Sequence, residues 1–167
     1  MKKKHKTIAA FIVLLLAAGA AYFIFKGTSE EEKVRKTLVK LTTLADKPQN
    51  VSPTEFAVKL RTMQTIFAEQ VVIDFGARRL SDVYSARSLE PLMINFRKHF
   101  ITASCSLSDE EITVNGERAN AVFACRFKGR PQQGNYVDEV RDVSCQLVKH
   151  DKTWYIEKIS INDILER

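Results

Sequence analysis

The sequence predicts an α+β domain in which three N-terminal helices pack on a curved antiparallel sheet, preceded by one transmembrane helix. Three observations predict this architecture. Residues 8–25 form an unbroken apolar run, apolar residues between about 30 and 100 recur at helical spacing, and from Ile101 onward they recur at every second position. Helices that come first and strands that follow are typical of an α+β fold whose helices gather on one face of the sheet.

The first element is a predicted membrane anchor. The 18 residues 8–25 are all apolar or small. At about 1.5 Å per residue they reach about 27 Å, close to the thickness of the hydrocarbon core of a bilayer. We therefore expect a short basic tail at 1–7, a signal-anchor helix at 8–25 and a linker at 26–29, followed by one domain at 30–167.

The basic tail predicts the orientation of the anchor. It contains Lys residues and no acid before the apolar run, which places it in the cytoplasm by the positive-inside rule. This predicts a single-pass protein of a bacterial inner (cytoplasmic) membrane with its domain outside the cytoplasm. A cleaved signal peptide is the alternative, because Ala18-Gly19-Ala20 resembles a cleavage site, although the apolar run continues beyond it to Phe25.

The charge distribution argues against nucleic-acid binding. The chain has a formal net charge of +6, but five of its 26 Lys and Arg residues flank the apolar run. Residues 27–167 carry the other 21 together with all 20 Asp and Glu residues, and the two signs are interspersed. The basicity therefore reflects membrane topology, and we expect no nucleic-acid partner.

The three cysteines, Cys105, Cys125 and Cys145, have apolar neighbours two positions away on both sides. In a strand this spacing places each thiol on the buried face, where a Cys behaves as a small hydrophobic residue. We therefore expect buried structural thiols, with a bridge between neighbouring strands as the alternative. A nucleophile or metal site is disfavoured, because no Cys-X-X-Cys motif or pair of His residues accompanies them.

Two helices are predicted before residue 70. Ser29 and Glu32 form a capping-box pattern, and the helix that it begins is expected to run to about Asp46. The start signal is repeated by Ser52, Pro53 and Glu55, which predict a helix over about 53–69. The apolar faces consist of Val34, Leu38, Leu41 and Ala45 in the first helix and Phe56, Leu60, Met63, Phe67 and Val71 in the second.

A short strand and a third helix are predicted next. β-Branched residues indicate a strand at 71–75, and a mixed segment without a clear period follows at 77–84. Ser85 or Ser88 then caps a helix in which Pro91 is tolerated only in the first turn. The inner side of this helix is expected to contain Leu89, Leu92, Phe96 and Phe100.

About four antiparallel strands are predicted after this helix. They cover residues 101–107 and 112–114, 119–127, 137–149 and 154–161. The pair Asn115-Gly116 tolerates positive φ and predicts a hairpin turn. A polar loop at 128–136 and a tight turn at Asp151-Lys152 separate the remaining strands.

Two segments carry a resemblance to a known superfamily: the hairpin at 112–122 (ITVNGERANAV) and the closing strand at 154–161 (WYIEKISI). In these segments, and in the order of elements over about 30–165, the chain resembles the NTF2-like superfamily, which includes SnoaL-like proteins and ketosteroid isomerase. The resemblance implies a cone in which a bent sheet wraps a long helix and leaves an apolar pocket. Because the superfamily contains both enzymes and binding proteins, it implies no single function.

An enzyme of this superfamily would need a general base and a polarising donor in that pocket. Asp74 and Tyr84 are the nearest candidates in chain order, and His99, three residues after Phe96, is a third. Each also fits a structural role, at a strand end, in an amphipathic wall or at the boundary of the core. The sequence contains no HxxxH, GxxxxGK or GxGxxG motif, so we expect neither a metal nor a cofactor.

The missing catalytic set favours a membrane-anchored, non-catalytic domain that binds a partner protein or forms a homodimer through its sheet face. Its layout is similar to that of inner-membrane scaffold subunits of type IV secretion systems and of Mce-associated membrane proteins. A small-pocket lyase or isomerase, and a binder of an apolar small molecule, are the alternatives.

Overall fold

The computed structural model describes residues 29–76 and 80–162. The chain divides into two compact units, Met1–Glu30 and Glu31–Arg167, and the fold is that of the second unit. The tail at 1–7, the anchor at 8–25 and most of the linker at 26–29 lie outside the described residues. In the part that is described, none of the helices is both long enough and apolar enough to cross a bilayer.

The predicted helices are α2 (Glu30–Ala45), α3 (Pro53–Ile66) and α4 (Leu89–His99). The start of α3 confirms the expected capping box: Ser52 Oγ accepts a hydrogen bond from the Glu55 N–H, and the Glu55 carboxylate accepts one from the Ser52 N–H. Helix α3 ends at Ile66 rather than at 69, because Phe67 adopts extended backbone (φ −98°, ψ 144°) and begins a strand.

The start of α4 differs in detail from the expectation. Ser88 is the N-cap residue, but its side chain makes no capping hydrogen bond and instead donates to the Ser85 carbonyl oxygen at 2.9 Å. Pro91 lies in the first turn, as predicted, where its missing N–H removes no helical hydrogen bond.

The first two strands form an antiparallel hairpin where the sequence predicts only one short strand. Strand β1 (Phe67–Phe75) begins four residues before the predicted strand. All of β2 (Leu80–Ser85) except Ser85 falls in the segment predicted to be mixed. The two strands are antiparallel, with Val71 opposite Tyr84. Between Ser81 and Ser85 only Tyr84 is partly buried, so β2 carries no alternation of apolar and polar residues that could predict it.

Six strands form one sheet in the order β2-β1-β6-β5-β4-β3. The long strands are β3 (Phe100–Asn115), β4 (Arg118–Pro131), β5 (Val137–His150) and β6 (Thr153–Asn162). They pair antiparallel with their sequence neighbours, as predicted. Strand β1 pairs in parallel with β6, with Ile73 opposite Ile159, so the sheet is mixed rather than wholly antiparallel.

The two predicted segments 101–107 and 112–114 are halves of the single strand β3. The β3–β4 register shifts between Ser108 and Glu111, and Asp109 has φ +54°. An extra residue of this kind is a β-bulge, which bends a strand and interrupts its alternation. The bulge therefore explains why the sequence pattern breaks at this point.

The β3–β4 turn lies one residue later than predicted. Asn115 is still paired with Arg118, so Gly116 and Glu117 form the two-residue loop. Of these two, Gly116 alone has a positive φ, +62°. A glycine at the first loop position is typical of a type II′ turn, whereas the expected pair Asn115-Gly116 suits a type I′ turn.

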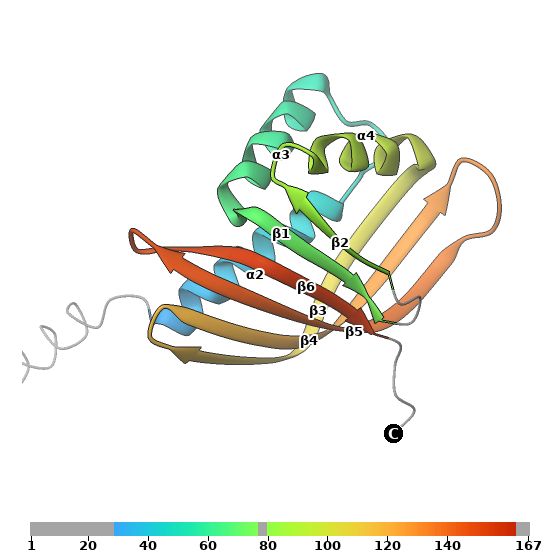
Figure 1. The fold of residues 1–167 in the computed structure, drawn as a ribbon. Helices are drawn as coiled ribbons and strands as arrows, with labels where there is room; N and C mark the ends of the chain where they lie inside the picture. The colour runs from blue at the N-terminus through green and yellow to red at the C-terminus, as the bar shows by residue number, and fades with distance from the viewer. Residues whose placement is uncertain (1–28, 77–79, 163–167) are drawn as a thin grey trace, which may run out of the picture. The chain divides into compact units, whose positions relative to one another are not determined.

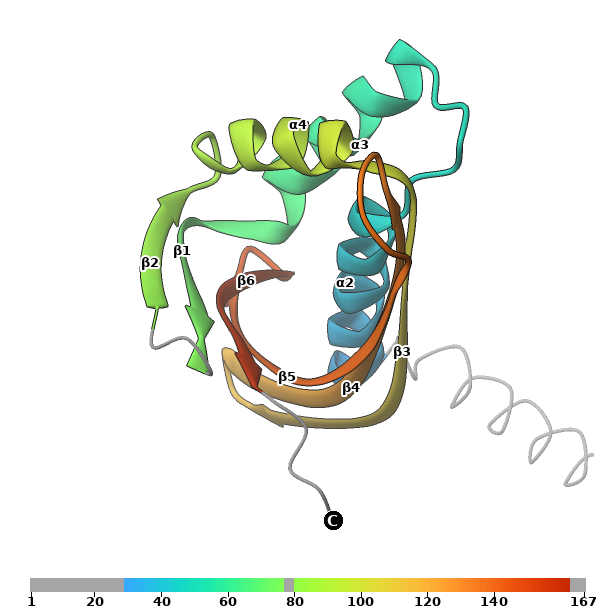
Figure 2. The same cartoon turned by 90° about the vertical axis from the view of Figure 1, so that its right-hand side faces the viewer.

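The sheet curves around α2, which packs on its concave face (Figures 1 and 2). Val34 and Leu38 of α2 are fully buried, together with large residues of the sheet such as Trp154, Leu147 and Ile156. Burying these side chains is the main source of stability for the domain. The arrangement confirms the predicted α+β cone.

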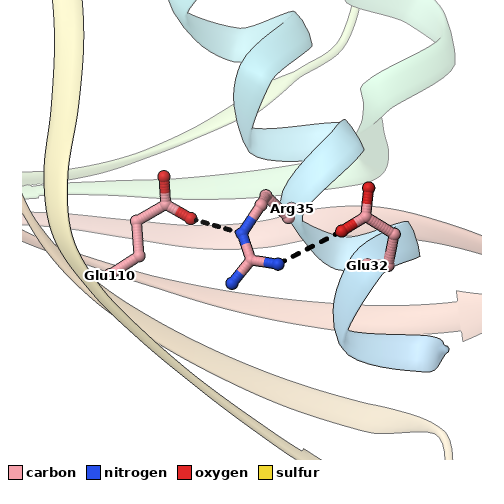
Figure 3. A network of polar contacts seen from close by, with 3 residues as sticks. All are labelled: Glu32, Arg35 and Glu110. Carbon is pink, nitrogen blue, oxygen red and sulfur yellow. Dashed lines mark hydrogen bonds and ion pairs between the residues drawn. The ribbon is translucent and has the colours of Figure 1, made fainter.

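An ion-pair network fixes the first half of α2 to the sheet (Figure 3). Arg35 donates through Nε to Glu110 at 2.9 Å and through Nη1 to Glu32 at 3.2 Å. These hydrogen bonds, that to Glu110 first, raise the pKa of Arg35. Because Glu110 directly follows the bulge residue Asp109, the bulge presents its carboxylate to the helix. The pair is solvent-exposed and contributes more to the position of α2 than to stability.

Candidate functional site

An apolar cavity of about 250 Å³ lies between the three helices and β1. It is lined by Leu41, Leu44, Ala45, Met63, Phe67, Ile73, Leu89, Leu92, Met93 and Phe96. None of these described lining residues carries an ionisable group or a hydroxyl. The cavity therefore presents an apolar surface without an acid, a base or a nucleophile.

Helical spacing builds most of the lining. The four residues from α4 recur at intervals of three, one and three, and the three from α2 follow the same kind of spacing, so each set shares one helix face. The predicted inner side of α4 is confirmed for Leu89, Leu92 and Phe96, whereas Phe100 belongs to β3. Leu89 is 5% exposed and Leu92 43%, which places Leu92 at the mouth of the cavity.

Asp74 and Tyr84, the first two candidate site residues, lie on opposite faces of the β1–β2 hairpin. Tyr84 is opposite Val71 and packs against the core, whereas Asp74 is three positions along β1 from Val71 and points to the other face. Asp74 pairs with Lys158 Nζ at 3.7 Å. Tyr84 Oη donates to Asp82 Oδ2 at 3.3 Å, and desolvation, followed by this carboxylate, raises the pKa of Tyr84. The two side chains do not converge, and neither lines the cavity.

His99, the third candidate, is the last residue of α4 and is exposed. Its ring stands edge-on to the ring of Phe100, with centroids 4.8 Å apart. Arg97 and Lys98 precede it in the last helical turn, where cationic side chains interact favourably with the negative end of the helix dipole. The structure thus places His99 beside Phe100 and outside the cavity lining.

Two lysines hold the helices that surround the cavity, a role that the sequence does not reveal. Lys59 Nζ donates to the carbonyl oxygens of Thr43 (2.5 Å) and Asp46, at the end of α2. Lys47 Nζ donates to the carbonyl oxygens of Arg97 (2.7 Å) and Phe100, at the end of α4. Desolvation lowers the pKa of both lysines. Each ammonium group satisfies carbonyls that a helix end leaves unpaired.

The three cysteines are free thiols on β3, β4 and β5. Cys145 is buried, whereas Cys105 and Cys125 are half-buried and their Sγ atoms lie 2.8 Å apart. Periodicity predicts the inward face of each strand, but the proximity of this pair depends on the β3–β4 register, which no local pattern specifies.

Metal binding finds no support in the part of the chain that the structure describes. Residues 29–76 and 80–162 contain no group of three or more His, Cys, Asp or Glu side chains placed to hold an ion. The apolar cavity is the candidate site because of its lining, and the chemistry that it offers is burial of an apolar group.

No protein-family profile and no characterised protein matches the chain in sequence.

Comparison with solved structures identifies proteins of similar fold. An NTF2-like superfamily protein from Salmonella enterica matches with a TM-score of 0.65 at 13% identity, over 81% of this chain and 91% of that one. An NTF2-like protein from Novosphingobium aromaticivorans matches with a TM-score of 0.63 at 12% identity, over 91% and 90%. A Novosphingobium protein provisionally named scytalone dehydratase matches with a TM-score of 0.62 at 12% identity, over 81% and 85%. Identities this low show a shared fold alone, so the described domain has an NTF2-like fold and its activity does not follow from the comparison.

Proposed function

We propose that this protein is a membrane-anchored, non-catalytic NTF2-like domain that binds an apolar group in its cavity, outside the cytoplasm of a bacterium. The observation that supports the proposal is the cavity lining, in which all ten described residues are apolar. General acid–base and nucleophilic catalysis need a titratable group within hydrogen-bonding distance of the reacting atoms. A lining without such groups favours binding over turnover.

The size of the cavity narrows the class of ligand. Its volume of about 250 Å³ is slightly below the ~300–1,000 Å³ of typical small-molecule pockets. A small apolar molecule, or the apolar end of a lipid-like molecule, suits this volume. The anchor proposed at 8–25 would hold the domain beside a bilayer that supplies such molecules.

A charge at the mouth of the cavity tests the proposal. Binding of the neutral dye N-phenyl-1-naphthylamine to the full-length protein is followed by fluorescence, and lipids are then tested as competitors. Leu92→Glu is expected to weaken dye binding about tenfold or more, because ligand binding would desolvate the new carboxylate. The melting temperature should change little, because Leu92 is 43% exposed.

Ile94→Glu is the matched control. Ile94 is on the same helix, is 37% exposed and does not line the cavity, so this variant should bind the dye as the wild type does. Equal binding by the wild type and Leu92→Glu, or no binding by the wild type, would contradict the proposal.

A protein partner or a homodimer is a second candidate, supported by apolar side chains on the outer face of the sheet. Val122 of β4 is 42% exposed and Val140 of β5 is 37% exposed. Crosslinking in the native membrane followed by mass spectrometry tests it. Reproducible crosslinks from this face to another protein would support a scaffold role, and crosslinks between copies would support a dimer.

The enzymatic alternative, a small-pocket lyase or isomerase, is supported by the similarity of fold to the provisionally named dehydratase. It requires that Asp74→Asn and Tyr84→Phe abolish turnover without lowering the melting temperature. We favour binding because these two side chains lie on opposite faces of the hairpin.

A further inference from the structure

We propose that Cys105 and Cys125 form an intramolecular disulfide that joins β3 to β4, and that Cys145 stays a free thiol. This inference does not depend on the proposed ligand. It rests on the placement of three cysteines on three adjacent strands.

The geometry brings the two sulfur atoms together. Cys125 is opposite Leu107 in the β3–β4 ladder, and Cys105 is two residues from Leu107, so both thiols point to the same face as diagonal neighbours. Their Sγ atoms are 2.8 Å apart, about 0.8 Å more than the ~2.0 Å of a disulfide bond. The two sulfur atoms must therefore approach each other by about 0.8 Å to form the bond.

The surroundings hold this pair in register. The backbone N–H of Cys105 donates to Asp46 Oδ1 at 3.0 Å, and Lys47 and Ala103 exchange backbone hydrogen bonds of 2.7 and 2.9 Å. The segment that follows α2 is thus attached to β3 at the cysteine. A thiol held at a fixed position loses less conformational entropy when it is bridged.

Cys145 cannot take part in the bond. On β5 it is four residues from Arg141, the residue opposite Cys125, which corresponds to roughly 13 Å of strand. Bridged cysteines have Cα atoms within about 7 Å of each other. Cys145 is also fully buried, whereas the other two are half-buried and accessible to a reagent.

Oxidation proceeds by exchange with a small disulfide such as oxidised glutathione. The Cys125 thiolate attacks one sulfur of the reagent, which releases one reduced thiol and leaves a mixed disulfide on Cys125. Cys105 then loses its proton, and its sulfur attacks the Cys125 sulfur and releases the second reduced thiol. Donation from the Cys105 S–H lowers the pKa of Cys125, which suits it to the first attack.

Trypsin separates the three cysteines and makes the test direct. Cleavage yields peptide 99–118 with Cys105, peptide 119–126 with Cys125 and peptide 142–149 with Cys145. The full-length protein is treated with oxidised glutathione, denatured and alkylated without reduction, digested and analysed by mass spectrometry. We expect a cross-linked pair of 99–118 and 119–126, lighter by two hydrogen atoms, and an alkylated 142–149.

Single variants identify the partners. Cys145→Ala should keep the cross-linked pair, whereas Cys105→Ala should lose it and accumulate glutathione on peptide 119–126. Oxidation should raise the melting temperature of the wild type and of Cys145→Ala by about 5–10 °C, and that of Cys125→Ala by much less. Alkylation of all three cysteines in the oxidised wild type, or a bond that includes peptide 142–149, would overturn the proposal.

Discussion

Burial shifts the titration of the Cys145 thiol. It lies in the core between Ala121 of β4 and Ile159 of β6, and desolvation raises its pKa to about 12. The folded protein therefore stabilises the neutral thiol relative to the thiolate, as expected for a Cys that acts as a small hydrophobic residue.

This shift predicts a pH dependence of stability. Below pH ~9 the thiol is protonated in both states, whereas above it the unfolded chain loses the proton and the folded chain does not. The free energy of unfolding should then fall with rising pH by up to about 1.4 kcal/mol per pH unit up to pH ~12. Urea unfolding of reduced protein between pH 8 and 11 measures the slope.

Cys145→Ala provides the control for this slope, because every other titratable group is retained. The variant should be less stable at neutral pH but should lose less stability as the pH rises. Parallel curves for the wild type and the variant would contradict the assigned burial of the thiol.

Gly129 of β4 allows the rings of Phe100 and Phe127 to pack against the backbone of this strand. A Cβ at this position would lie 2.6 Å from Phe100 Cε1 and 2.9 Å from Phe127 Cε1, and the two rings pack edge to face with centroids 5.3 Å apart. The glycine is thus required by close approach of side chains and not by a positive φ.

Gly129→Ala should therefore destabilise the domain by about 1–3 kcal/mol, the usual cost of overpacking. Denaturant unfolding measures it. In a Phe100→Leu background the nearest ring is absent, so the same substitution should cost clearly less. An equal cost in both backgrounds would mean that the clash with Phe100 is not the cause.

At the scale of the elements, the β5–β6 turn contains backbone strain, because two residues other than glycine adopt positive φ there. Asp151 and Lys152 are both in the left-handed region, with φ +47° and +68°, as a type I′ turn requires. Lys152 has a Cβ that disfavours this conformation, whereas glycine has none.

Lys152→Gly is expected to stabilise the domain by about 0.5–1 kcal/mol, somewhat less than the full strain, because glycine also loses more entropy on folding. Lys152→Ala is the matched control, since it removes the same side chain but keeps the Cβ. Thermal unfolding compares the two. If both variants have the same melting temperature, backbone strain at residue 152 is not significant.

The elements also show where sequence patterns predict structure and where they fail. The α3 start was predictable, because the reciprocal bonds of Ser52 and Glu55 are local in the chain. The turn at Asp151-Lys152 was predictable for the same reason. Strand β2 was not, because its exposed side chains leave only Tyr84 to mark an inward face.

At the scale of the whole molecule, the predicted anchor can be tested independently of the domain. The apolar run at 8–25 predicts retention of the full-length protein in membranes washed with alkaline carbonate, because transfer of about 20 apolar residues from lipid to water is strongly unfavourable. A variant that lacks residues 1–26 should be released in the same wash. Release of a soluble, shortened product from the full-length protein would favour the cleaved signal peptide.

The candidate site was predicted only in part. The inner side of α4 was expected from spacing, and it supplies Leu89, Leu92 and Phe96 to the cavity. The residues singled out for chemistry, Asp74, Tyr84 and His99, all lie outside the lining. Their proximity to a pocket was inferred from order along the chain, and order does not specify which face of a hairpin a side chain occupies.

The sequence by itself determined the features that depend on neighbours within about one helical turn or one strand: the helix starts, the alternation of the long strands and the α+β order. The tertiary structure alone decided the parallel pairing of β1 with β6, the contact of Cys105 with Cys125 and which residues of the three helices and β1 line the apolar cavity. The physical reason is the separation along the chain of the residues that interact. Periodicity determines which face of an element is buried, whereas strand register and helix packing depend on contacts between residues far apart in the chain.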